Sequence, residues 1–247
     1  NLFLDIPDTV LSADMSIEAQ ETALLQYLEA VRPDSVVAVD SVYLETKSEQ
    51  LANFIRIYGG RTSDNVVSAV LDRNPQWNNI LVVADWTGSM YGYGAQVLEW
   101  HVKNFERSEI NYFTLFNDGD HKIKKIVGET GGIYMAETYN LEKLILLYNI
   151  VMLKGGGGDG PENDLEAVLE GMHHYPDFGA VVLIADNNAC VRDMSLLTHI
   201  DVPVHVILCG YTPHVGANPQ YVEIAIKTGG SVHTIQDDIL AMEAEVS

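Results

Sequence analysis

Basic residues are scarce in this chain. It has 247 residues, with 14 Lys+Arg against 35 Asp+Glu and a formal net charge of −21. Such a field repels the phosphate backbone of nucleic acids and the anionic surface of a membrane, so we expect neither as a partner. An acidic surface serves solubility, and it also suits a protein that needs cations. Both interpretations of the charge stay open at this point.

Cysteines and long apolar runs are also few. Cys190 and Cys209 are too few for a disulfide framework, and they could form one bridge or remain buried free thiols. No run of about eighteen apolar residues occurs, so we expect no membrane span. The chain begins with Asn1 rather than Met. Removal of a signal peptide, or trimming of the chain at its N-terminus, would each give that start, and of the two we expect the first, in an exported protein, periplasmic or extracellular.

The first 77 residues show no clear rhythm of strands. Segment 16–33 has apolar side chains at helical spacing and ends at a proline. Segments 48–60 and 63–75 have the pattern of short helices that begin at Ser and end at Gly or Pro. We therefore predict a helical N-terminal extension over residues 1–77, followed by a second domain over residues 78–247.

From residue 78 onward, buried strands alternate with helices. Continuous apolar runs predict strands at 79–85, 179–186 and 202–210, and Asp118-Gly119 predicts a hairpin within 110–137. Helical spacing predicts helices at 94–105, 140–153, 162–175 and 219–230, then an edge strand at 231–235 and a final helix at 237–246. This alternation indicates an α/β fold with a doubly wound, mainly parallel sheet flanked by helices.

Oxygen-bearing side chains follow the predicted strands. The stretch Asp-Trp-Thr-Gly-Ser ends the first strand, Gly-Gly-Gly-Gly-Asp-Gly-Pro-Glu opens a helix, and another aspartate ends the strand at 179–186. Ligands of such sheets bind beyond the carboxyl ends of the strands, where the strand order reverses. Carboxylates and hydroxyls suit hard cations such as Mg²⁺, Mn²⁺ or Ca²⁺. The candidate ligands are Asp85, Thr87, Ser89, Asp159, Glu162 and Asp186.

These three segments resemble the metal-ion-dependent adhesion site of von Willebrand factor A domains. The resemblance covers roughly residues 78–240. The family's first motif is Asp-x-Ser-x-Ser, and here Thr87 replaces its first serine while it keeps a hydroxyl. The resemblance implies that Glu162 contacts the ion, and that Asp159 serves a neighbouring ion or the loop. The third motif, usually Thr-Asp-Gly, reads Ala-Asp-Asn at 185–187, which keeps the ligand Asp186 but changes both neighbours.

The resemblance implies a binding module rather than an enzyme. A divalent cation, Mg²⁺ in the first place, would capture an acidic group of a protein partner through an open coordination position. Two alternatives stay open. A metal-dependent hydrolase would need a general base, for which His101 is the nearest candidate in the sequence, and a structural module would have no ion at all.

Overall fold

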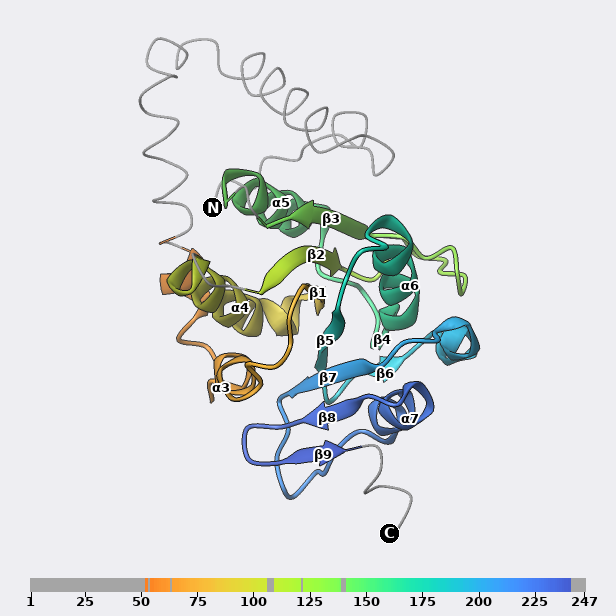
Figure 1. Ribbon diagram of the computed structural model, residues 1–247. Helices are drawn as coiled ribbons and strands as arrows, with labels where there is room; N and C mark the ends of the chain where they lie inside the picture. The colour runs from red at the N-terminus through yellow and green to blue at the C-terminus, as the bar shows by residue number, and fades with distance from the viewer. Residues whose placement is uncertain are drawn as a thin grey trace, which may run out of the picture.

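The fold is built on one mixed, mostly parallel sheet. The computed structural model describes residue 52 and residues 54–62, 64–105, 109–120, 122–138 and 141–240. Seven strands lie in the order β3-β2-β1-β5-β7-β8-β9 (Figure 1). Their bounds are Ile80–Asp85 (β1), Ile110–Phe116 (β2), Ile133–Glu137 (β3), Ala180–Asp186 (β5), Val204–Cys209 (β7), Ser231–His233 (β8) and Asp238–Leu240 (β9). Only the outer pairs, β2–β3 and β8–β9, are antiparallel. The predicted α/β fold is confirmed at this level.

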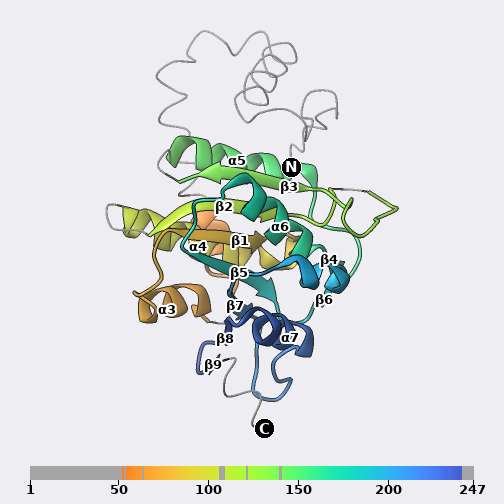
Figure 2. The same ribbon diagram turned by 45° about the vertical axis from the view of Figure 1, so that its right-hand side comes forward.

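Helices cover both faces of the sheet. Their bounds are Val66–Arg73 (α3), Tyr91–Lys103 (α4), Leu141–Lys154 (α5), Asp164–His174 (α6) and Pro219–Thr228 (α7), with 3₁₀ turns at Gly88–Met90 (η2) and Met194–His199 (η4). The side chains of α3, α4 and α5 pack on one face, with Val82 and Ala84 of β1. Those of α6, α7 and η4 pack on the other face, with Leu81 and Val83 (Figures 1 and 2).

The burial of the central strand β1 explains why its apolar run predicted a strand. Every residue of β1 is buried, as expected of a parallel strand covered on both faces. β1 pairs with β2 on one side and with β5 on the other. The chain leaves β1 through α4 towards β2, whereas the strands that follow β5 build the opposite half of the sheet. The strand order therefore reverses at the carboxyl ends of β1 and β5.

The last predicted helix is wrong in its described part. Residues 238–240 form β9, which pairs antiparallel with β8, so β8 is not the edge strand that the sequence suggested. The local spacing of apolar residues favoured a helix, but tertiary contacts override such a weak local preference. The remainder of that prediction, 241–246, lies outside the described residues. The helix predicted from residue 162 begins at Asp164 instead, because Pro161–Glu162 form the short strand β4, paired with Cys190–Val191 (β6).

The hairpin prediction is confirmed in its pairing and wrong in its turn. β2 and β3 pair antiparallel, but residues 117–132 connect them, which is far longer than the two-residue turn expected at Asp118-Gly119.

Both cysteines are free thiols, Cys190 exposed and Cys209 buried. Every helix among the described residues is too short or too polar to cross a bilayer.

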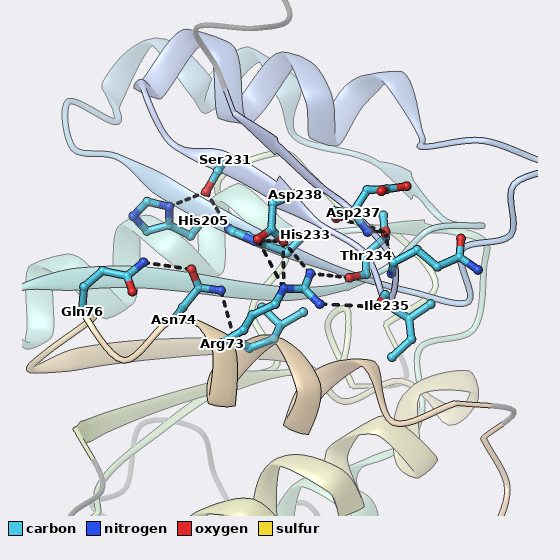
Figure 3. A network of polar contacts seen from close by, with 12 residues as sticks. Arg73, Asn74, Gln76, His205, Ser231, His233, Thr234, Ile235, Asp237 and Asp238 are labelled. Atoms are coloured by element: carbon cyan, nitrogen blue, oxygen red, sulfur yellow. Dashed lines mark hydrogen bonds and ion pairs between the residues drawn. The ribbon is translucent and has the colours of Figure 1, made fainter.

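A polar network fixes α3 to the far edge of the sheet (Figure 3). The Arg73 guanidinium donates to the Asp238 carboxylate of β9 at 3.0 Å and to the carbonyl of Thr234 at 2.5 Å. Val66, Val67 and Val70 of α3 lie in the same apolar cluster as β1 and α4. The helix predicted at 63–75 therefore exists and packs on the sheet, while the helix predicted at 16–33 lies outside the described residues.

Candidate metal site at the carboxyl ends of β1 and β5

The turn after β1 brings three of the predicted ligands together. Asp85 Oδ1 accepts a hydrogen bond from the Thr87 backbone N–H at 2.8 Å, which bends the chain out of the strand. Thr87 Oγ1 lies 3.5 Å from Ser89 Oγ. The Asp85 and Thr87 side chains are buried, whereas Ser89 is exposed in η2, just before α4. The three oxygen-bearing side chains thus extend from the buried part of the site to its exposed part.

Asp186 joins this turn from the neighbouring strand. Its Oδ2 accepts a hydrogen bond from the Ser89 hydroxyl at 3.0 Å, although 97 residues separate the two in sequence. Its Oδ1 accepts from the backbone N–H of Asn188 at 2.8 Å and from the Asn188 amide at 3.2 Å. Asn188 is not among the residues predicted for the site, and the only signal for it in the sequence is its position two residues after a strand-ending aspartate.

Glu162 reaches the site from β4. Only 5% of it is exposed. The glycine-rich segment before it needs residues without a side chain, because the Gly156 carbonyl accepts a hydrogen bond from the Gly88 N–H at 3.2 Å. A Cβ at Gly156 would lie 3.0 Å from that same nitrogen, and Gly158 has a φ of +142°, which other residues rarely adopt. The glycines thus let the segment that carries Glu162 approach the β1 turn.

These residues surround a cavity of about 280 Å³. It is lined by Thr87, Gly88, Ser89, Gly156, Asp159, Gly160, Glu162, Asp186, Asn188 and Ala189. None of these described lining residues carries a positive charge. Asp85 lies just beneath the cavity, hydrogen-bonded to the lining residue Thr87. The wall is therefore made of carboxylates, hydroxyls, an amide and backbone.

Burial and mutual repulsion raise the pKa of two carboxyl groups here. Burial raises the pKa of Asp85 to about 7, with a further contribution from the Asp186 charge, although the hydrogen bonds from Thr87 oppose both. Burial, followed by the charges of Asp85 and Asp118, raises the pKa of Glu162 to about 10. A neutral Glu162 is therefore favoured in the metal-free protein, and a bound cation would reverse that preference.

Asp159 lines the cavity but is already paired. Its carboxylate accepts from Lys125 and, at 3.0 Å, from Arg192. The hydrogen bond from Lys125 is the largest of the effects that hold the Asp159 pKa at about 2. The same two cations pair with Asp118, which is fully buried on the β2–β3 loop. This four-residue cluster could not be predicted from the sequence, because its members are separated by up to 74 positions.

Two buried oxygens without a hydrogen-bond partner indicate whether a cation fits this site. Asp85 Oδ2 and Glu162 Oε2 are both buried, and neither has a hydrogen-bond partner among the described residues. Leaving a buried acceptor unsatisfied costs about 1–3 kcal/mol. Within the described part of the chain, no three Asp, Glu, His or Cys side chains are close enough to hold a metal by themselves. A dication therefore needs the hydroxyls of Thr87 and Ser89 as well, and the donor set present supplies them.

The aromatic and histidine residues close to the first motif in the sequence do not line the cavity. Trp86 is fully buried, and its ring lies 4.4 Å from that of Tyr148, so it packs beneath the site. His101 is buried on α4 between the rings of Phe105 and Phe113, and it does not line the cavity. The candidate base for a hydrolase is therefore not at the site.

No protein-family model matches this chain. A comparison with curated proteins likewise gives no match. The residues and geometry of the site itself are therefore what indicates its function.

Proposed function

We propose that this chain is a metal-dependent protein-binding module of the von Willebrand factor A type. A divalent cation, Mg²⁺ first among the candidates, would be held by Asp85, Thr87, Ser89, Glu162 and Asp186. Bound there, it would supply the positive charge that lets an acidic protein capture a carboxylate of its partner. Asp159 would act on the loop, since Lys125 and Arg192 already neutralise it.

One observation carries the proposal most strongly. Two buried carboxylate oxygens, Asp85 Oδ2 and Glu162 Oε2, have no partner beside a cavity whose described lining has no positive charge. Buried charges in proteins are normally paired or coordinate metals. The Ser89–Asp186 contact at 3.0 Å further supports the idea that β1 and β5 contribute to one ion.

Calorimetric titration with Mg²⁺ and Mn²⁺ tests the site. We expect the wild-type chain to bind a dication, and Asp186→Ala to abolish binding while the fold survives. Thr87→Val should weaken the affinity more than Thr87→Ser, because serine restores the hydroxyl donor. Asp201→Ala is the matched control, since Asp201 is exposed and lies on the loop that leads into β7, away from the cavity. Wild-type affinity in the Asp186→Ala variant would show the assignment to be wrong.

A further inference from the structure

One loop carries an unusual share of the exposed apolar surface. Seven large apolar side chains are exposed among the described residues. Three of them lie within five positions of the β2–β3 loop: Ile123 (102% exposed), Ile126 (48%) and Val127 (40%). Single exposed apolar residues are ordinary, but a group of them marks an interaction surface. We call residues 122–127 the loop tip.

The loop tip is also basic. Lys122, Lys124 and Lys125 are three of the chain's 14 Lys+Arg, and they occur within four residues. Lys122 and Lys124 are exposed. The Lys122 ammonium donates to the carbonyl of Thr130 at 2.7 Å, which ties the tip back to its own loop. The Lys125 side chain is buried and already paired with two aspartates, so a chain of net charge −21 presents two exposed lysines beside apolar side chains.

Hydrogen bonds join the loop to the candidate metal site. Lys125 pairs with Asp159 of the cavity wall. The Asn163 amide, one residue after Glu162, donates to the carbonyl of Gly131 at 2.9 Å. Both views show the β2–β3 loop extending past the end of the sheet, on the side where β4 lies (Figures 1 and 2). A partner seated on the cavity would therefore meet the loop tip beside it.

We propose that the loop tip is a second contact surface for a protein segment in which aliphatic side chains flank an acidic one. This inference rests on the proposed function, because the acidic side chain is the group offered to the cation. The aliphatic side chains would cover Ile123 and Ile126, and Lys124 would attract further acidic residues of the segment. The tip would then decide which carboxylates the module accepts.

The net charge argues against two other occupants. An anionic membrane would be repelled by the overall charge of −21. A second copy of the chain would bring the same net charge and the same repulsion. A short segment of a partner avoids both costs, since it presents few charges and meets the positive group directly.

Selection from a random peptide library tests the surface. The library is displayed on phage, bound to the whole chain in Mg²⁺, and eluted with EDTA. We expect the eluted peptides to share an Asp or Glu with aliphatic residues close to it. The affinity of the chain for synthetic copies of these peptides is then measured. The double variant Ile123→Ser/Ile126→Ser should lower this affinity about tenfold. Lys124→Glu should also lower it, and the loss should be smaller at high salt, which screens the charge.

Matched variants separate docking from general damage. Phe105→Ser changes an apolar residue that is 42% exposed, comparable to Ile126, between the end of α4 and the start of β2, and Lys227→Glu changes an exposed lysine at the end of α7. Both should bind the peptides as the wild type does. The Mg²⁺ affinity of the double variant should also be unchanged, which would place the loss in the peptide contact.

Each contrary result has a distinct meaning. EDTA-eluted peptides that contain an acid without aliphatic neighbours, or that bind the double variant normally, would overturn the loop surface and leave the metal site standing. Failure to elute any peptide with EDTA would refute metal-dependent capture itself, and the loop proposal with it. The chain could instead bind phosphatidylserine vesicles, and the double variant could lose that binding. This result would assign the loop tip to a membrane and overturn the proposal.

Discussion

Replacing Asp85 by Asn should stabilise the protein without metal and destabilise it, relative to the wild type, with metal. Asn keeps the oxygen that accepts from the Thr87 N–H, but it removes the ionisable oxygen that has no partner. In the absence of a cation, the wild-type chain must either protonate Asp85 or bury its charge. The substitution removes the cost of burying or protonating this carboxylate, and it also removes the ability to hold an ion.

The pKa of Asp85 sets the size of the effect. Burial raises it from an ordinary 3.8 to about 7. One pKa unit corresponds to about 1.4 kcal/mol, so ionising Asp85 in the folded chain costs about 4 kcal/mol in free energy of unfolding. The folded state holds this proton more tightly than the unfolded state. The corresponding stability is therefore complete below about pH 4 and is lost as the pH rises through about 7.

Denaturant unfolding at several pH values measures both arms of the prediction. In EDTA at pH 8, Asp85→Asn should have the larger unfolding free energy, and the difference should vanish towards pH 4. In saturating Mg²⁺ at pH 8, the order should reverse, because only the wild type gains stability from the bound ion. A variant that is less stable than the wild type in EDTA at pH 8, or that Mg²⁺ stabilises equally, would refute the reasoning.

Two further predictions concern the stability of the fold. Burial, together with the nearby His233, lowers the pKa of His205 to about 4, so the stability contributed by the neutral His205 imidazole is lost as the pH falls from about 6.5 towards 4. His205→Phe, which keeps a ring beside Trp77, should make the unfolding free energy fall less steeply over that range, and an unchanged slope would contradict this account. Gly94→Ala should cost about 1–3 kcal/mol in thermal unfolding, because the new Cβ would lie 2.3 Å from the Trp86 ring; Gly60→Ala, with open space around it, is the control, and equal effects would contradict the argument.

The sequence predicted most of the sheet but not its edge strand β9. β1, β5 and β7 are continuous apolar runs, and burial on both faces leaves that pattern in any parallel strand. The segment at 237–246 misled because Ile239 and its neighbours satisfy a helical spacing as well as a strand. What selects the strand is the exposed backbone of β8 and the anchoring of Asp238 by Arg73 and His233, residues that the local pattern does not contain.

The sequence also predicted which residues could form a metal site, as far as the ligands adjoin one another. Asp85, Thr87 and Ser89 share one short turn, so their proximity follows from chain connectivity alone. Their meeting with Asp186 required only the rule that parallel strands end at one edge of the sheet. Whether a cation is bound there stays a prediction.

Only the tertiary structure decided how each carboxylate is used. Asp159 and Glu162 stand three positions apart, and only the family resemblance distinguished them before the fold was known. In the fold, Lys125 and Arg192 neutralise the first, while the second is buried with an unpaired oxygen. The physical reason is that the free energy of a charge depends on the water it loses and the charges it meets. The residue sequence fixes neither of these until distant loops are folded against each other.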